Sequence, residues 1–217
     1  MENLHKNIKS ASLVLLLDAT WIRVLAQDKA VLIAYDTSIG VVDYLIRNSE
    51  SKHGYATIFR RLAKIGYKPI CVVSDGHTAL ESVIKTLNLP HQRCVVHLLR
   101  DLERLLGKKK GGKLEGVNKS IYYTFRDVWF TKRIEDIPEK IAKIRFKKKK
   151  WIVEWFKKTL PDAILHISFE EKVPYTTNLL ENINGQIKQR VKTMRGMKSK
   201  TSLHNFLKIL FYFRFYK

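Results

Sequence analysis

Three acidic residues stand at positions where a carboxylate is unexpected unless it has a specific role. Asp18 follows an uninterrupted apolar run, Leu13–Leu17, which predicts a buried strand, and a charge there is costly unless it is paired or binds a cation. Asp75 ends a second apolar segment, where open α/β sheets place their sites, and Glu181 lies in a segment typical of a helix. Carboxylates are preferred ligands of Mg²⁺ and Mn²⁺, and two such ions about 4 Å apart support phosphoryl transfer. The three acids are therefore candidates for a two-metal centre.

Each of these acids also has an ordinary structural explanation. Asp18 could cap the turn after a strand, Asp75–Gly76 is a common turn dipeptide, and Glu181 could lie on a solvated helix face. Two rival acids carry less weight, because Asp36 falls in an expected turn and Asp43 alternates with apolar neighbours. None of the three candidates is decisive alone.

The elements that must position these acids follow from the apolar pattern of the first half of the chain. Short apolar runs predict strands, and apolar residues spaced three or four apart predict helices. Ser49 or Ser51 caps the first expected helix, which Gly66 ends. The expected strands are residues 12–17, 30–35, 41–46, 69–74 and 94–96, with a turn at 36–40, and two further helices cover 78–87 and 98–106. This mixed α/β order is compatible with a ribonuclease-H-like fold, although several other α/β folds share it.

The pattern changes at Gly107, where the basic and glycine-rich segment 108–112 predicts a flexible junction. The following residues are Lys-rich and helical in pattern, and the pair Trp151 and Trp155 could either stack on nucleic-acid bases or form the core of a small helical domain. The last segment predicts two helices separated near Gly196. We therefore expect a first part of the core at residues 1–106, an all-helical basic insertion at 107–168, and C-terminal helices that complete the core at 169–217.

The net charge of the chain is +21, from 41 Lys and Arg against 20 Asp and Glu. Residues 1–100 contribute +5 and residues 101–217 contribute +16, so the basic surface belongs mainly to the second half. Such a charge indicates a polyanionic partner, with nucleic acid favoured over a membrane surface. The two cysteines, Cys71 and Cys94, predict no disulfide framework, and no signal peptide or membrane span is recognised. We expect a cytoplasmic protein.

Four segments, in this order along the chain, resemble motifs of the Mutator-like transposases and their prokaryotic insertion-sequence relatives. Asp18–Thr20 resembles the "D-A-T" motif of the first aspartate, and Val72–His77 resembles the strand of the second. Gln92–Arg100 is similar to a C-x-x-H motif with a trailing arginine, and Thr176–Lys188 to a T-N-x-x-E-x-x-N helix. Their order and separations fit the family and leave room for its helical insertion between Asp75 and Glu181.

The resemblance implies a ribonuclease-H-like fold with a catalytic triad of Asp18, Asp75 and Glu181. It also implies two Mg²⁺ or Mn²⁺ ions bound by these residues, and DNA as the partner, both as transposon ends and as target. A metal-activated water would cut one strand, and the freed 3′-hydroxyl would attack target DNA. Homo-oligomers are a further possibility that the family suggests.

The C-x-x-H motif places Cys94, His97 and Arg100 within one segment, and Asn178 begins the motif of the third acid. Cys94 and His97 together supply only two of the four ligands that structural zinc requires. We therefore expect Cys94 to be a small buried residue. His97 is expected near the acidic site, where it would orient a phosphate or a carboxylate.

The helix of Glu181 predicts a surface suited to a DNA backbone. At 3.6 residues per turn, Asn184, Gly185, Lys188 and Lys192 share roughly one face with Glu181. A solvated basic helix face is the alternative. The expected DNA-binding residues are Lys188, Arg190, Lys192, Arg195 and Lys198.

The chain departs from the resemblance at its N-terminus, because only 17 residues precede Asp18, too few for a domain that recognises transposon ends. We therefore expect an N-terminally truncated transposase core whose activity is open. Two alternatives remain: an inactive, truncated DNA-binding remnant, and a structure-specific nuclease of the same fold.

Overall fold

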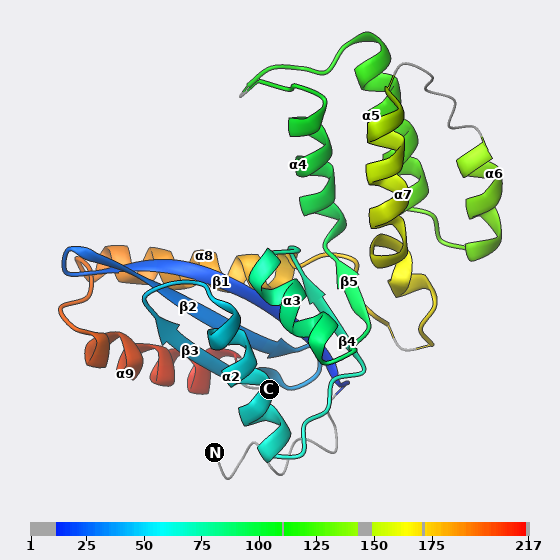
Figure 1. Ribbon diagram of the computed structural model, residues 1–217. Coiled ribbons are helices and arrows are strands. Elements are labelled where there is room, and N and C mark those ends of the chain that lie inside the picture. Colours follow the sequence, from blue (N-terminus) through cyan, green and yellow to red (C-terminus); the bar gives the residue numbers. More distant parts are fainter. Residues whose placement is uncertain (1–11, 110, 143–148, 171, 216–217) are drawn as a thin grey trace. The chain divides into compact units, whose positions relative to one another are not determined.

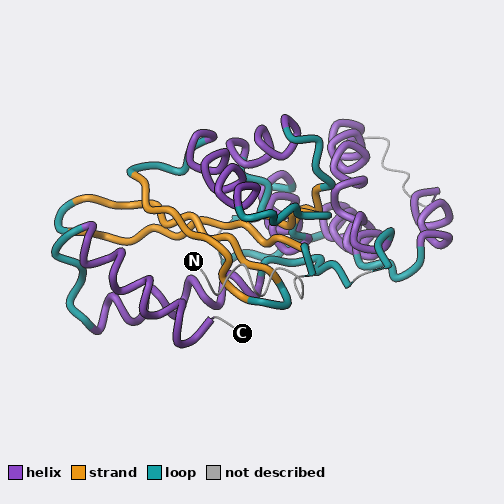
Figure 2. The backbone as a smooth tube through the Cα atoms, turned by 90° about the horizontal axis from the view of Figure 1, so that it is seen from below, coloured by secondary structure: helices purple, strands orange, loops and turns teal. Residues whose placement is uncertain are grey.

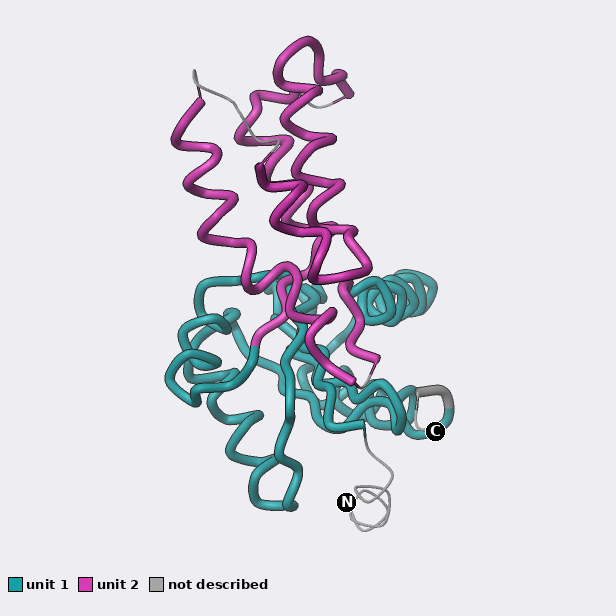
Figure 3. Tube along the Cα trace, turned by 90° about the vertical axis from the view of Figure 1, so that its right-hand side faces the viewer, with its two compact units in different colours: residues 1–90, 177–217 teal, residues 91–176 magenta. Residues whose placement is uncertain are grey.

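The computed structural model describes residues 12–109, 111–142, 149–170 and 172–215 of the chain. The chain folds into two compact units, one formed by Met1–Pro90 and Thr177–Lys217 and the other by His91–Thr176 (Figure 3). The first unit is therefore built from two separate stretches of sequence, whereas the second is continuous. No helix among the described residues is long and apolar enough to cross a membrane.

A mixed β-sheet organises the first unit (Figure 1; strands are orange in Figure 2). Strands β1 (Val14–Val24), β2 (Gln27–Asp36) and β3 (Gly40–Arg47) pair in antiparallel fashion, and β4 (Cys71–Ser74) pairs with β1 in parallel. Within this unit the strand order is β3-β2-β1-β4, and the short β5 (His91–Arg93) belongs to the second unit. The predicted mixed α/β class is confirmed.

Both faces of β1 are buried at residues 14–17, which explains the continuous apolar run there. On one face Leu15 and Leu17 share a core cluster with Tyr55 and Ile58 of α2 (Lys52–Lys64) and with Leu80 of α3 (Thr78–Thr86). On the other face α8 (Asn178–Thr193) contacts β1. The order of helix, strand and helix after β3 was predicted correctly. Ser51 caps α2 as expected, because its side chain accepts a hydrogen bond from the backbone of Gly54.

The C-terminal part of the first unit contains α8, α9 (Lys200–Leu210) and the short helical turn η5 (Phe211–Phe215). This confirms the predicted pair of helices and the break near Gly196, whose φ of 89° favours glycine. The segment between the helices is tied to the β1–β2 hairpin, because the backbone N–H of Leu25 donates to the carbonyl of Met197 at 2.9 Å. α8 is thus held to β1 along the strand and at its end.

The second unit is helical apart from β5. Its elements are α4 (Val95–Leu105), α5 (Gly116–Trp129), η2 (Ile134–Asp136), α6 (Ile137–Ala142), α7 (Lys150–Ile164) and η4 (Leu165–Ile167). Its core is aromatic: the rings of Phe125 and Phe156 stack with centroids 4.0 Å apart, and Trp129 lies 5.5 Å from Phe156. The predicted insertion, residues 107–168, covers only part of this unit, since α4 shares the same core.

One predicted strand is wrong. Residues 94–96 were expected to be extended, but β5 comprises His91–Arg93 and Val95 already begins α4. The buried residues Val95, Leu98, Leu99 and Leu102 follow helical spacing, so the amphipathic face of α4 extends back through the apolar residues that suggested a strand.

The two tryptophans of α7 lie in different environments, whereas the sequence suggested either a shared core role or stacking on nucleic-acid bases. The ring of Trp155 packs edge-on against Trp129, with centroids 5.9 Å apart, as expected for a core residue. Trp151 is 50% exposed. The basic segment Phe146–Lys150, which precedes this pair, lies partly outside the described residues. Packing against Trp129 accounts for Trp155 but not for Trp151.

Candidate metal centre

Asp18 lies within β1 rather than at its end, which corrects the sequence prediction. The strand continues to Val24 because Ile22 and Val24 are buried while Trp21 and Arg23 face solvent, a strand alternation. The parallel pairing of β1 with β4, however, ends at the pair Leu17 and Ser74. Asp18 is therefore the first residue of β1 that lies beyond its pairing with β4.

Asp75 directly follows Ser74, the last residue of β4. The register of the parallel pair thus places Asp18 and Asp75 each one residue beyond the last paired residues, Leu17 and Ser74. One carboxylate oxygen of Asp75, Oδ1, accepts a hydrogen bond from the backbone N–H of His77 at 2.9 Å. Gly76 between them has a φ of 88°, so this tight turn favours glycine.

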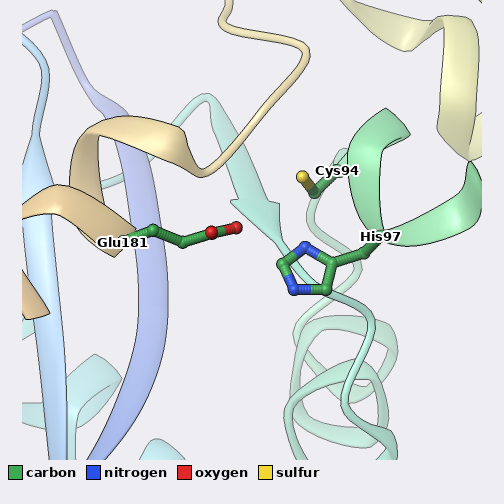
Figure 4. Close-up of side chains that lie close together, drawn as sticks. All are labelled: Cys94, His97 and Glu181. Atoms are coloured by element: carbon green, nitrogen blue, oxygen red, sulfur yellow. The ribbon is translucent and has the colours of Figure 1, made fainter. Parts of the chain in front are cut away.

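Helix α8, which carries Glu181, contacts β1. The side-chain amide Nδ2 of Asn184 donates to Oδ2 of Asp18 at 2.8 Å, and Oδ1 of Asp18 accepts from the backbone N–H of Ala19 at 2.8 Å. Glu181 precedes Asn184 by three residues and so occupies the same helix face, one turn toward the N-terminus. Its partly buried side chain projects from α8 (Figure 4). The sequence predicted that Asn184 shares a helix face with Glu181, but it did not predict the hydrogen bond from Asn184 to Asp18.

A fourth acid, Glu50, contacts His77, two residues after Asp75. Its Oε1 accepts a 2.5 Å hydrogen bond from the hydroxyl of the buried Tyr55. Burial raises the pKa of Tyr55 above its ordinary value, and the negative charges of Glu50, Asp75 and Asp18 raise it further. The Tyr55 hydroxyl is thus within electrostatic reach of three carboxylates. The sequence gives no sign of this, because Glu50 stands in a short polar loop between a strand and a helix.

The rival acids have structural roles elsewhere in the first unit. Asp36 is buried and accepts hydrogen bonds from the hydroxyl of Tyr67 at 2.7 Å and from the backbone N–H of Ser38 at 2.8 Å, so it caps the β2–β3 turn. Asp43 pairs with Arg61 at 2.8 Å, and burial raises the pKa of Asp43 to about 6. These structural roles agree with the sequence analysis, which ranked Asp36 and Asp43 below the three candidate acids.

The C-x-x-H motif lies at the beginning of α4 in the second unit, and Cys94 and His97 project from that end of the helix (Figure 4). Cys94 is fully buried and forms no disulfide, which agrees with the expected small buried residue. Within this motif an Arg100 guanidinium nitrogen lies 3.4 Å from Nε2 of His97. The role of His97 beside the carboxylates stays a prediction.

The remaining site residues lie on or just after α8. Asn178 is its first residue and is exposed. The expected DNA-binding side chains are likewise exposed: Lys188, Arg190, Lys192, Arg195 and Lys198. Gly185 has no atom within 4 Å of the position a Cβ would take, so that part of the helix surface is open.

The first unit thus carries Asp18 on β1, Asp75 directly after the parallel strand β4, and Glu181 on α8, a set of carboxylates of the kind that suits a divalent metal ion. Comparison with known proteins identifies the family. The model of "Transposase, Mutator family" matches residues 7–213, so the chain belongs to the Mutator family of transposases.

Curated relatives agree with this assignment. The chain is 26% identical over 194 residues to the transposase for insertion sequence element IS256 in transposon Tn4001 of Staphylococcus aureus, a match covering 82% of this chain and 46% of that protein. It is 25% identical over 177 residues to the transposase for insertion sequence element IS905 of Lactococcus lactis, covering 79% and 44%. The chain therefore spans less than half the length of these relatives.

Among solved structures, the HTLV-2 integrase catalytic core domain in complex with magnesium is similar with a TM-score of 0.31 and 16% identity. The match covers 44% of this chain and 69% of the integrase chain.

Proposed function

We propose that the first unit has a ribonuclease-H-like fold and carries the catalytic centre of a DNA transposase. Asp18, Asp75 and Glu181 are its metal-binding residues, and the reaction is DNA strand cleavage followed by strand transfer. The observation that supports this most strongly is the joint placement of Asp18 and Asp75 by strand register together with the hydrogen bond from Asn184 of the Glu181 helix.

The side chains present fit a hard divalent cation. The three acids offer only carboxylate oxygens, which Mg²⁺ and Mn²⁺ prefer. Asn184 adds a further oxygen donor, because its Oδ1 is buried and accepts no hydrogen bond from the described residues. Bound here, two such ions would supply an activated attacking oxygen and stabilisation of the leaving oxygen.

The protein's own groups in this centre position the carboxylates. The amide of Asn184 and the backbone N–H of Ala19 fix the two oxygens of Asp18, and the backbone N–H of His77 fixes one oxygen of Asp75. Each of these carboxylate oxygens keeps lone pairs beyond the hydrogen bond it accepts. Because the carboxylates repel one another, their clustering also favours a cation among them.

We further propose that DNA runs along α8, with transposon ends and target DNA as the two substrates. Lys188, Arg190, Lys192, Arg195 and Lys198 would contact phosphates, since all five are exposed. Lys188 and Lys192 share the face of Glu181 on α8, and Arg195 and Lys198 follow the end of that helix. Self-association, which the resemblance implies, stays a prediction.

The proposal is tested with the purified chain, Mn²⁺, a supercoiled plasmid and a labelled duplex carrying a free 3′-hydroxyl. We expect plasmid nicking and joining of the labelled strand. Asp18→Asn should lower both by at least about 100-fold, because such centres contribute several kcal/mol to the transition state. Asp28→Asn, which removes the same charge from an exposed position on β2, is the matched control and should leave both unchanged.

The products also separate the alternatives. Nicking without joining would favour a structure-specific nuclease, and salt-sensitive DNA binding without Mn²⁺-dependent cleavage would favour an inactive remnant. Cleavage that survives both Asp18→Asn and Asp75→Asn would rule out the assigned site.

A further inference from the structure

We propose that Tyr55 and Glu50 form a buried positioning chain that fixes Asp75 through His77. This inference rests on the proposed function, because it assigns Asp75 to the metal centre. Tyr55 and Glu50 would act through His77 rather than on the substrate, so both are positioning residues.

The chain of contacts begins in the core. Tyr55 is 0% exposed and belongs to the cluster that joins α2 to the sheet. Its hydroxyl donates to Oε1 of Glu50 at 2.5 Å, and the Glu50 side chain is 14% exposed. A largely buried carboxylate is costly unless it is hydrogen-bonded, so the Tyr55 hydroxyl holds Glu50 in this position.

The chain continues from Glu50 to the metal centre. The same Oε1 lies 3.3 Å from Nδ1 of His77, an electrostatic contact without the alignment of a hydrogen bond. The backbone N–H of His77 donates to Oδ1 of Asp75 at 2.9 Å. Glu50 and His77 thus connect the buried Tyr55 to one oxygen of Asp75, a candidate metal ligand. Groups that hold metal ligands typically change metal affinity by about 10- to 100-fold when removed.

The first unit contains a matched pair that lacks this connection. Tyr67 is 1% exposed and donates its hydroxyl to Oδ2 of Asp36 at 2.7 Å. Asp36 otherwise accepts hydrogen bonds from Ser12 and from the backbone of the β2–β3 turn, including Ile39. Tyr67→Phe, like Tyr55→Phe, therefore removes a buried hydroxyl that donates to a carboxylate, but it leaves the contacts of Glu50, His77 and Asp75 unchanged.

The first experiment measures the metal-free protein. Backbone amide hydrogen exchange of His77 is followed by NMR in wild type, Tyr55→Phe, Glu50→Gln and Tyr67→Phe, relative to amides in the sheet core. We expect exchange at His77 to be several-fold faster in Tyr55→Phe and Glu50→Gln, and unchanged in Tyr67→Phe after the change in global stability is taken into account.

The second experiment measures the Mn²⁺ dissociation constant by electron paramagnetic resonance. We expect it to rise about tenfold in Tyr55→Phe and in Glu50→Gln. The double variant should be no weaker than the weaker single variant, because both changes break one chain. Tyr67→Phe should bind Mn²⁺ like wild type.

The outcomes distinguish this inference from the proposed function. If Tyr55→Phe matches Tyr67→Phe in both measurements, the positioning chain is refuted while the metal centre stands. If Asp18→Asn binds Mn²⁺ as tightly as wild type, the metal centre itself is wrong, and the inference falls with it. Additive effects of Tyr55→Phe and Glu50→Gln would also contradict a single chain.

Discussion

The two compact units of this chain differ in where they place their polar groups. In the first unit several carboxylates are wholly or partly buried and have defined side-chain partners, among them Asp18 with Asn184, Glu50 with Tyr55, and Asp36 with Tyr67. The second unit instead has a core of stacked aromatic rings and an exposed basic surface. A buried acid needs hydrogen-bond partners that only a specific tertiary arrangement supplies. An aromatic helical core needs mainly side chains of the right total volume at hydrophobic positions with helical spacing. The proposed metal centre accordingly draws its three acids from the first unit.

The largest expected effect tests the aromatic core of the second unit. Phe156→Ala removes a fully buried ring stacked on Phe125 and should lower the free energy of unfolding by about 3–5 kcal/mol. Trp151→Ala, on the same helix but 50% exposed, is the control and should cost about 0.5 kcal/mol or less. Urea unfolding followed by circular dichroism measures both. Equal losses would mean that Trp151 also packs in the core.

A second prediction concerns the buried Asp43 of the first unit, outside the proposed centre. Its pKa is raised from 3.8 to about 6 by burial, so the folded state binds this proton more tightly than the unfolded state does. Stability should therefore fall as pH rises from about 4 to 6, by up to about 3 kcal/mol for this group. Asp43→Asn should lose this dependence in urea titrations across that range. A difference between the two proteins that stays constant with pH would contradict the assigned environment.

A third, smaller effect tests the link between α8 and β1. Asn184→Ala removes the hydrogen bond to Asp18 and should destabilise the metal-free protein by about 1.5–3 kcal/mol, as expected for a bond to a charged group. Asn182→Ala, an exposed neighbour on the same helix, should have little effect. Thermal unfolding of the two variants measures the comparison. Similar melting temperatures would show that the amide of Asn184 does not hold Asp18.

The smallest expected effect asks which unit binds DNA. Replacing Lys188 and Lys192 of α8 by alanine should reduce the slope of log affinity against log salt by about 0.9 for each phosphate that the protein no longer neutralises. The exposed pair Lys157 and Lys158 of α7 provides the matched replacement in the second unit. Fluorescence anisotropy with a DNA duplex at several salt concentrations measures both slopes. If the slope changes equally or more for the α7 pair, the principal DNA-binding surface lies on the second unit instead.

Local pattern was sufficient for most of the fold and for the position of two acids. Asp18 and Asp75 follow strongly apolar segments, so their placement at the sheet could be predicted from hydrophobicity alone. Local pattern failed where it was ambiguous: Val95 and Val96 suit a strand by residue type, yet the helical spacing that continues through Leu98 and Leu102 decides the structure. The length of β1 was underestimated because Asp18 was taken as its end.

Tertiary contacts account for what the sequence could not predict. Asn184 was expected on the face of Glu181, but its hydrogen bond to Asp18 depends on how α8 packs against β1. Glu50 carries no local signal, since its importance arises from Tyr55, five residues later, and from His77 beyond β4. Partners brought together only by folding are invisible to a periodic pattern.

The most direct test of the metal centre is anomalous diffraction from crystals of this chain grown with Mn²⁺. The account predicts anomalous density bound by carboxylate oxygens of Asp18 and Asp75, with Glu181 contributing from α8, and its loss in Asp18→Asn crystals. Well-ordered crystals at saturating Mn²⁺ with no anomalous peak at these carboxylates, or with a peak that persists in Asp18→Asn, would contradict it.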